Sequence, residues 1–492
     1  MTLESKLEKA NRFVAENKDT VVSDYRHHYH VMAPIGWVND PNGFVFYKGE
    51  YHLFFQHYPY DSSWGPMHWG HVKSKDLVHW EELPIALAPD QPYDKDGCFS
   101  GSAIEKEGKL YLMYTGHVVE EDVVYQRQCI AVSEDGIHFE KSHQNPVIEE
   151  TILGKNSTIH DFRDPKVFVH DGMYYSVVAT KSESNHGRIL LFSSQNLIDW
   201  QFYSVMLAGD DQQGIMWECP DFFTLDGKDV LIMSPIQIPK RGYEFHNISS
   251  TIAFIGKMNW DSGKFQIENN HEIDGGLDFY APQTLEDDQG RRIMIAWMQM
   301  WDRTLPTHTL GHKWSGAMTL PRQLRVEKNH LVQKPVELVY ETIAIDHEIS
   351  ELSVSEEVVL TEEFNENVYL KFEADFSEST SFKMQLAKNA ESALVLSYEK
   401  DEQLLTLSRE NFGHAIIGNE DPVLFSRSMV VPLVDQQIVL ELFRDTSSLE
   451  VFVNETQSMT MTFYEKQKGR DVVVNSQGTT RLSHIKEGHL LV

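Results

Sequence analysis

Cysteine, long apolar runs and basic charge are all scarce in this sequence. Its 492 residues include only three cysteines, Cys98, Cys129 and Cys219, which are too scattered for a disulfide framework and are typical of a reducing compartment. No stretch approaches the roughly 18 consecutive apolar residues of a membrane span, and the N-terminus opens with charges instead of the apolar core of a secretion signal. We therefore expect a cytoplasmic protein that is neither exported nor inserted into a membrane.

Basic residues are outnumbered, with 43 Lys and Arg against 74 Asp and Glu and a formal net charge of −31. A chain of this charge is repelled by polyanions, which disfavours nucleic acid and anionic membranes as partners. The remaining composition, 41% hydrophobic and 24% charged, is that of a globular protein long enough to form two bodies with buried cores.

What the sequence does contain is a repeated layout of polar start, strand, Gly-containing turn and second strand. It first occurs where Trp37-Val38-Asn39-Asp40-Pro41-Asn42-Gly43 runs into an alternating strand. Taken alone, this stretch is ordinary turn chemistry, because Pro presets its own φ and Asn-Gly accepts left-handed geometry. The layout returns four more times, and the five turn glycines are Gly49, Gly108, Gly172, Gly227 and Gly290.

A second marker has the same period. An aromatic residue follows each of the first four hairpins, at Trp80, Phe139, Trp200 and Trp260, with separations of 59, 61 and 60 residues. A period of about 60 residues with about four short strands is typical of radially repeated all-β folds, so five units predict a five-bladed β-propeller. Equivalent strand starts then converge on the axis. Three of the five starts carry a carboxylate, Asp40, Asp164 and Glu218, as glycoside hydrolysis requires.

The segments before and after the repeats differ from them in composition and hydrophobic periodicity. Residues 1–30 carry apolar residues at helical spacing, which predicts an N-terminal helix and a lead-in to the propeller at 31–335. The His-rich stretch 25–30 lacks the spacing of a known metal site, so we expect core or turn histidines and neither a metal nor a cofactor. The acidic passage 336–365 is interpreted as a linker. The short alternating strands of 366–492 predict a β-sandwich with a supporting or homodimer-forming role.

Five sequence blocks, in order, carry a resemblance to a known family. They are Trp37–Gly43, Phe99-Ser100-Gly101-Ser102-Ala103, Arg163-Asp164-Pro165, Glu218-Cys219-Pro220-Asp221 and Ser315-Gly316-Ala317-Met318-Thr319-Leu320-Pro321-Arg322. Together they resemble glycoside hydrolase family 32, the invertases, fructanases and sucrose-6-phosphate hydrolases, with Val38 in place of a Met in the first block. The resemblance implies the same propeller and sandwich.

The resemblance also implies roles for single residues. It makes Asp40 the nucleophile at the fructosyl anomeric carbon, Glu218 the acid and then the base, and Asp164 a ligand of sugar hydroxyls that stabilises the oxocarbenium-like transition state. The residues it implies for the sugar pocket are Asn39, Gln56, Trp64, Phe99, Ser102, Arg163, Tyr280 and Trp297. From position alone, the tryptophans fit blade packing as well as a platform for sugar.

Several functions stay open from the residues alone. The carboxylates favour a retaining hydrolase that releases fructose over a non-catalytic sugar-binding propeller, whereas a fructosyltransferase would share the fold and the carboxylates. A thiol nucleophile at Cys219 is disfavoured, since no His stands near it in a Cys-His-Asn pattern. The expected lack of export favours an imported, phosphorylated sugar, and the block from Trp69 to Glu81 resembles the bacterial sucrose-6-phosphate hydrolases of the family. This resemblance implies sucrose 6-phosphate as the substrate, with sucrose or short fructo-oligosaccharides as alternatives.

A phosphorylated sugar requires cations close to the pocket, because salt screens longer-range fields beyond about 8 Å. Lys240 and Arg241 follow the hairpin that begins at Glu218 and are the first candidates for phosphate binding. Arg303 and Lys313 are second candidates. The alternative for each is an ordinary exposed loop cation.

Overall fold

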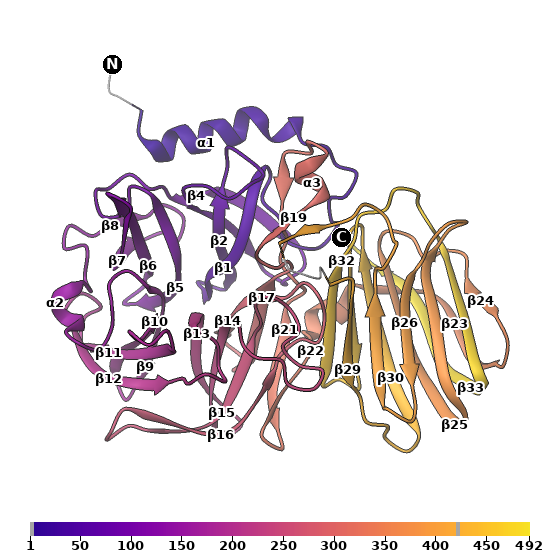
Figure 1. The fold of residues 1–492 in the computed structure, drawn as a ribbon. Helices are drawn as coiled ribbons and strands as arrows, with labels where there is room; N and C mark the ends of the chain where they lie inside the picture. The colour runs from indigo at the N-terminus through magenta and orange to yellow at the C-terminus, as the bar shows by residue number, and fades with distance from the viewer. Residues whose placement is uncertain (1–3, 420–423) are drawn as a thin grey trace.

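The computed structural model describes residues 4–419 and 424–492 as two β-rich bodies packed side by side, with the N-terminal helix lying over the first body (Figure 1). The first body consists of four-stranded sheets arranged around an axis, one of which gains a short fifth strand, and the second is a β-sandwich. The predicted five-bladed propeller and C-terminal sandwich are thereby confirmed. No helix among the described residues is long and apolar enough to cross a membrane.

The five blades follow one another along the chain. The first strands of neighbouring blades contact each other in a complete ring, from β1 through β5, β9, β13 and β17 back to β1, so they line the axis. The blades are β1 (Gly36–Tyr47), β2 (Glu50–Tyr58), β3 (His68–Ser74) and β4 (Trp80–Leu87); β5 (Gly97–Lys106), β6 (Lys109–Glu120), β7 (Val123–Ser133) and β8 (Glu140–Lys141); β9 (Phe162–His170), β10 (Met173–Lys181), β11 (Gly187–Ser194) and β12 (Trp200–Ala208); β13 (Met216–Leu225), β14 (Lys228–Ile236), β15 (Ile252–Asn259) and β16 (Lys264–Glu272); β17 (Tyr280–Glu286), β18 (Arg292–Trp297), β21 (Arg322–Glu327) and β22 (His330–Pro335).

The ring is closed by a short parallel strand. Between β18 and β21 the chain forms β19 (Arg303–Thr304), α3 (Pro306–Thr309) and β20 (Trp314–Ser315). Trp314 pairs with Gly36, and Ser315 with Trp37, so β20 of the last repeat joins the sheet of the first. The first strand of blade 1 is thus held by both ends of the propeller.

The predicted turn glycines are set by backbone geometry. All five have φ between +72° and +82°, where glycine is favoured, and a Cβ added at any of them would meet nothing within 4 Å. In four hairpins the preceding residue also has a positive φ: Lys48, Glu107, Asp171 and Asp226. Two consecutive left-handed residues are typical of the type I′ turn, whose twist matches that of the strands it joins.

Before the first three aromatic markers, a Ser-x-Asp or Ser-x-Asn sequence forms the turn between the third and fourth strands. In blade 1 the backbone N–H of Leu77 donates to Ser74 Oγ, and the N–H groups of Val78 and His79 donate to Asp76 Oδ1. Blade 3 repeats this with Ser194 and Asn196, and blade 2 with Ser133 and Asp135. These side chains satisfy backbone donors that the turn removes from the ladder.

The predicted N-terminal helix is α1 (Lys6–Asn17), followed by the 3₁₀ turn η1 (Lys18–Thr20). It begins with a capping box, since Ser5 Oγ accepts from the N–H of Glu8 while the Glu8 carboxylate accepts from the N–H of Ser5. The helix packs on blade 1, where Asn11 Oδ1 accepts from the N–H of Ile85. One further short helix, α2 (Glu150–Leu153), precedes blade 3.

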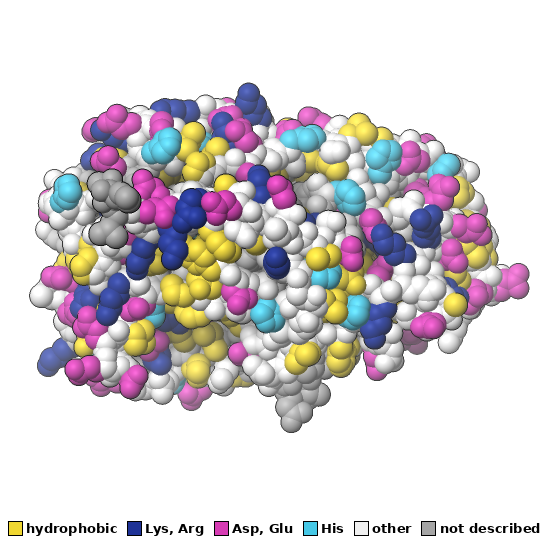
Figure 2. Space-filling model, turned by 90° about the horizontal axis from the view of Figure 1, so that it is seen from above, with side chains coloured by type: hydrophobic (Ala, Val, Ile, Leu, Met, Phe, Trp, Pro, Cys, Tyr) yellow, Lys and Arg dark blue, Asp and Glu magenta, His cyan; other side chains and the backbone are white. Residues whose placement is uncertain are grey.

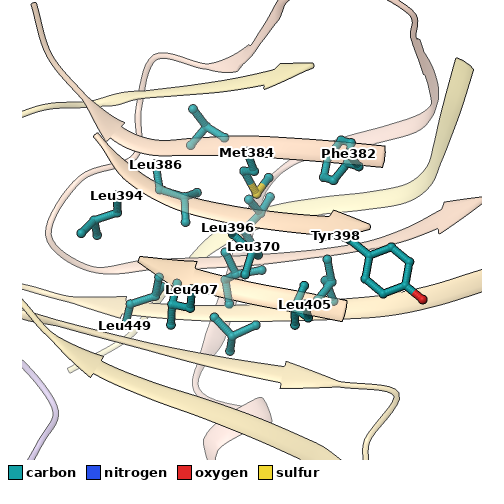
Figure 3. Close-up of a cluster of buried hydrophobic side chains, with 14 of the residues drawn as sticks. Leu370, Phe382, Met384, Leu386, Leu394, Leu396, Tyr398, Leu405, Leu407 and Leu449 are labelled. Carbon is teal, nitrogen blue, oxygen red and sulfur yellow. The ribbon is translucent and has the colours of Figure 1, made fainter. Parts of the chain in front are cut away.

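The sandwich is organised by two long strands, β25 (Val368–Lys388) and β33 (Asp471–Leu490), which pair with each other along most of their length. Its core is a single cluster of aliphatic and aromatic side chains, part of which Figure 3 shows around Met384 and Leu396. The other strands are β26 (Leu394–Glu399), β27 (Leu404–Ser408), β29 (Ser426–Val430), β30 (Gln437–Asp445), β31 (Ser448–Val453) and β32 (Gln457–Thr462), and β28 (Ile417–Gly418) pairs with β19 of the propeller.

Residues 336–365, interpreted above as a linker, are structured. They form α4 (Glu337–Glu341), β23 (Ile343–Val354) and β24 (Val358–Thr361), and both strands pair with β33. The acidic composition reflects an exposed strand, because Glu348 and Glu351 lie on β23 with their surfaces in solvent. We therefore assign β23 and β24 to the sandwich.

The outer surface mixes both signs of charge. Figure 2, seen from above, shows acidic and basic side chains interspersed over that face, without a continuous basic area.

Candidate active site

A β-bulge interrupts the register of each axial strand close to its beginning. The breaks fall between Val38 and Pro41, Phe99 and Gly101, Arg163 and Lys166 (paired with Ala179 and Val177), Glu218 and Asp221, and Tyr280 and Gln283. A bulge bends the strand and re-aims its side chains. Five bulges at one level of the ring turn the first residues of the axial strands toward the same cavity.

The carboxylates are not at fully equivalent positions, which corrects the reading of the sequence. Asp40 and Asp164 each precede a proline, but the residue in that position of β13 is Cys219, and Glu218 lies one residue earlier. Asp164 and Cys219 have φ of 65° and 47°, uncommon for residues other than glycine and a form of strain found at functional sites.

Asp40 is buried on the cavity floor. Its Oδ2 accepts a hydrogen bond of 2.6 Å from Ser100 Oγ and lies 3.5 Å from the Cys219 sulfur. Its Oδ1 has no hydrogen-bond partner among the described residues. Burial raises the pKa of Asp40, the bond from Ser100 opposes the shift, and the charge of Glu218 adds to it.

Glu218 is held by a cation on one oxygen and by a phenol on the other. Arg163 donates to Oε1 through Nε at 3.0 Å and Nη2 at 2.9 Å, and the Tyr280 hydroxyl donates to Oε2 at 2.6 Å. Two N–H groups of one guanidinium fix the carboxyl plane as well as its charge. Tyr280 is fully buried, so it acts by orienting Glu218.

Asp164 is held by the residue that follows Glu218. The N–H of Cys219 donates to its Oδ2 at 3.0 Å, and the Cys219 thiol lies 3.6 Å from the same oxygen. Burial raises the pKa of Asp164 to about 7; the charge of Arg163 opposes this, and the charges of Glu218 and Asp40 reinforce it. Burial also raises the pKa of Cys219 well above its usual range, so the thiol stays protonated and is a donor, not a nucleophile.

The three carboxylates border one open cavity of about 490 Å³. Its size suits a disaccharide, and its lining combines carboxylates with aromatic rings, as sugar sites do. Trp64 stands at its edge with 47% of its surface exposed and packs against Phe99, which in turn stacks on the ring of His117. Carboxylates and an aromatic ring beside one cavity are the groups that glycoside chemistry requires.

The comparisons with known proteins agree with this geometry. Residues 30–335 match the N-terminal domain of glycosyl hydrolases family 32, and residues 340–487 match the C-terminal domain of the same family. The chain belongs to glycosyl hydrolase family 32. The resemblance drawn from five sequence blocks is confirmed, together with the fold it implied.

Members of this family are similar to the chain over nearly its whole length. The sucrose-6-phosphate hydrolase of Escherichia coli is 36% identical over 492 residues, covering 98% of both chains, and that of Bacillus subtilis is 36% identical, covering 95% of both. Among solved structures, the sucrose-6-phosphate hydrolase of Lactobacillus gasseri has a TM-score of 0.85 at 29% identity, with 96% of both chains covered. A Bombyx mori family 32 β-fructofuranosidase mutant in complex with sucrose has a TM-score of 0.83 at 31% identity, with 98% of this chain and 97% of that chain covered.

Most of the residues expected in the sugar pocket border the cavity. With the three carboxylates, these are Asn39, Gln56, Trp64, Phe99 and Arg163. Three others lie behind it. Tyr280 reaches the site only through Glu218, Trp297 is buried against Trp37 and Trp301, and Ser102 is buried with its hydroxyl donating to the Pro165 carbonyl.

The serine of blade 2 that reaches the cavity is Ser100, which the sequence analysis did not select. It lies in the bulge between Phe99 and Gly101, whereas Ser102 lies beyond it on the regular part of β5. His117, Gln126 and Trp301 also line the cavity without having been expected. Only the position of Ser100 in the Phe99–Ala103 block offered a signal, since the other three follow no repeated motif.

None of the four cations considered for phosphate lines this cavity. Arg241 turns to Glu244 and Asn270, Lys240 is exposed, and Lys313 donates to Thr20. Arg303 is buried and donates to the Leu277 carbonyl and to Asp278.

The described residues contain one group able to offer three metal ligands, His27, His30 and Asp445, whose ligand atoms lie within 4.8 Å of one another. It stands where the lead-in meets the sandwich, away from the cavity. Asp445 already accepts from the N–H groups of His28 and Thr446, and His30 uses both ring nitrogens, on Asp445 and Glu450. These contacts are those of a hydrogen-bond network.

Proposed function

We propose that the protein is a retaining β-fructofuranosidase that cleaves the fructosyl bond of sucrose 6-phosphate. The observation that carries this proposal is the convergence of Asp40, Asp164 and Glu218 on one cavity in a family 32 chain. The substrate follows from relatives named sucrose-6-phosphate hydrolases, several of which cover nearly the whole chain.

Asp40 is proposed as the nucleophile. Ser100 fixes one of its oxygens and so orients the carboxylate, which lines the cavity. Attack forms a fructosyl ester and breaks the bond to the glucosyl oxygen, and water then releases fructose with net retention. Retention requires carboxyl groups about 5 to 5.5 Å apart, a distance too short for an intervening water.

Glu218 is proposed as the acid and then the base. It gives its proton to the glucosyl oxygen as the bond breaks and takes one from the incoming water. Arg163 and Tyr280 support this role because they fix both carboxyl oxygens in one orientation. Asp164 is proposed to bind sugar hydroxyls, and its charge would stabilise the positive oxocarbenium-like transition state.

The proposed substrate also indicates the compartment in which the enzyme works. A phosphorylated sugar carries charges that make it cross an apolar bilayer poorly, so its hydrolase works where the phosphorylated sugar is held; we propose the cytoplasm. We also propose that the sandwich, which begins near residue 340, supports the propeller and offers a surface for a homodimer. Sedimentation at several concentrations tests the second point.

The test of the function is a comparison of kcat/KM on sucrose 6-phosphate, sucrose, 1-kestose and inulin. We expect sucrose 6-phosphate to be favoured. Equal values for sucrose and its phosphate would refute the substrate, and release of fructose from none of them would refute the activity.

A further inference from the structure

The cavity rim is unevenly charged. The residues that line it include Val124, His160 and Asp161 before or within blade 3, and Ile236, Trp301 and Asp302 from blades 4 and 5. Arg163 is the single Lys or Arg among the described residues that line the cavity, and Glu218 occupies its guanidinium. A phosphate arriving with the leaving glucosyl group must therefore find its cations next to the lining.

A line of alternating charges leads out of the site on the Asp161 side. From Glu218 it passes to Arg163, whose Nη1 lies 3.4 Å from Asp161 Oδ1, and then to Lys181, whose Nζ lies 3.0 Å from Asp161 Oδ2. Lys181 is the last residue of β10, and 29% of its side chain is exposed. Two cations thus share one carboxylate that borders the cavity.

Both contacts of Asp161 are replaceable. The bonds from Arg163 Nη1 to Asp161 and to Gln126 Oε1 are long, at 3.4 and 3.3 Å. The ion pair with Lys181 is partly open to water, where such pairs contribute little. A phosphate offers three acceptor oxygens and nearly two charges, so it competes well with a carboxylate for a lysine.

His160 supplies a second group on the same side. Its Nδ1 donates to the Val124 carbonyl, which fixes the ring, so Nε2 can donate to a phosphate when the ring is the imidazolium form with a proton on each nitrogen. Asp302, which also lines the cavity, is an exposed carboxylate that repels a phosphate and has no cation paired with it among the described residues, whereas Asp161 has Arg163 and Lys181 next to it.

We propose that the 6-phosphate of the leaving glucosyl group binds Lys181 and His160, with Asp161 giving up its contact to Lys181 as the phosphate arrives. This inference rests on the proposed function and identifies the residues that distinguish sucrose 6-phosphate from sucrose. It places the phosphate on blade 3, beside the acid, and not at Lys240 and Arg241 on blade 4.

The test is the selectivity ratio, kcat/KM for sucrose 6-phosphate divided by kcat/KM for sucrose. Lys181→Gln should lower this ratio about tenfold or more, the loss expected for one charge-assisted bond, and His160→Gln should lower it less. Lys181→Arg should keep most of it, because the charge remains. The matched control is the double variant Lys240→Ala with Arg241→Ala, which should keep the wild-type ratio.

A second measurement uses glucose 6-phosphate as an inhibitor of sucrose hydrolysis, with glucose for comparison. Lys181→Gln should weaken inhibition by glucose 6-phosphate about tenfold and leave inhibition by glucose unchanged. An unchanged ratio in Lys181→Gln, an equal loss on both substrates, or a tenfold fall in the Lys240 and Arg241 control would each overturn the proposal. A wild-type ratio near one would instead refute sucrose 6-phosphate as the preferred substrate, so the two failures are distinguishable.

Discussion

Buried carboxylates gather in two places in this molecule, at the propeller axis and at the junction with the sandwich, and their partners differ. At the junction each is matched by a cation: Asp274 contacts Arg322, Asp278 contacts Arg303 and Arg409, and Glu450 contacts Arg322 and His30. At the axial cavity, by contrast, Arg163 is the one Lys or Arg among the described lining residues, and it forms an ion pair with Glu218 but not with Asp40 or Asp164. The same residue types are thus neutralised in one place and left in excess in the other.

The difference appears in the pKa values. Burial acts to raise the pKa of Glu450, but the charge of Arg322 and the bond from His30 lower it to about 2. At the axis burial and like charges raise the pKa of Asp164 to about 7. Neutralised carboxylates hold two bodies together, whereas carboxylates in excess are poised to exchange protons and to meet positive charge in a substrate.

The largest expected effect comes from removing axial charge. Asp40→Asn and Glu218→Gln should each lower kcat by about four powers of ten, equivalent to about 5.5 kcal/mol, because the nucleophile or proton donor is lost. Asp40→Asn should not lose stability at neutral pH, since burial already disfavours the Asp40 charge, whereas Glu218→Gln removes the ion-pair partner of Arg163 and should lower the melting temperature. The measurements are kcat and the melting temperature of each variant. Retention of more than about a tenth of wild-type kcat would contradict the assigned role.

The junction should respond in the opposite way. Glu450→Gln leaves Arg322 and His30 short of a buried counter-charge, so we expect a loss of about 3 to 5 kcal/mol in the free energy of unfolding while folded enzyme keeps its kcat. Urea unfolding and active-site-normalised kinetics measure the two quantities. The matched control is Glu455→Gln, whose partner Lys334 forms an exposed pair worth less than about 1 kcal/mol. Equal destabilisation by both variants would remove the distinction between buried and exposed pairs.

The two places should also differ in pH dependence. The contribution of Glu450, on the order of 3 kcal/mol, is present above its unfolded pKa of about 4.3 and is lost as pH falls toward 2. Burial acts to lower the pKa of His30, yet its bonds to Asp445 and Glu450 raise it to about 9. Its contribution is therefore complete below about pH 6.5 and is lost as pH rises through 9.

Asp164 at the propeller axis adds a further pH dependence to the free energy of unfolding. Because the folded pKa of Asp164 is raised, its ionisation costs stability as pH rises through about 7. Asp164→Asn should therefore be more stable than wild type at pH 8, with the difference disappearing near pH 4. Urea unfolding between pH 3 and 9 tests both places together. A variant that loses stability at pH 8 would show that Asp164 is compensated in the folded state.

The five-bladed ring could be predicted from the sequence, but the β-bulges of its axial strands could not. Gly49, Gly108 and their equivalents report the hairpin period directly, because each requires a left-handed φ that its own sequence position encodes. The bulges depend on pairing with a neighbouring strand, so the choice between Ser100 and Ser102 was hidden. Arg241 was misleading for a similar reason, since its partner Asn270 comes from β16, far along the chain.

The prediction of a linker at residues 336–365 was based on composition, and the structure has strands there. An acidic, Ser-rich passage has the composition of a solvent-exposed linker. The backbone of β23 nevertheless pairs with β33, which lies more than a hundred residues further along the chain. Long-range pairing of this kind has no local signature when the strand is exposed on its surface. The three carboxylates were found because a repeated element carried each of them to the same level of the axis.

The smallest expected effect concerns Ser100, whose hydrogen bond acts to lower the pKa of Asp40. Ser100 donates to Asp40 Oδ2 and favours its ionised form, which is the form that attacks. Ser100→Ala should raise the pKa of Asp40 further, move the acidic limb of the kcat/KM profile to higher pH, and lower kcat about tenfold, consistent with the roughly 1.5 kcal/mol of one bond to a charge. Ser102→Ala is the matched control on the same strand. Its hydroxyl binds the Pro165 carbonyl behind the site, so it should cost stability and leave the acidic limb in place. An acidic limb that moves equally in both variants would assign the effect to the blade 2 strand as a whole and not to the hydrogen bond on Asp40.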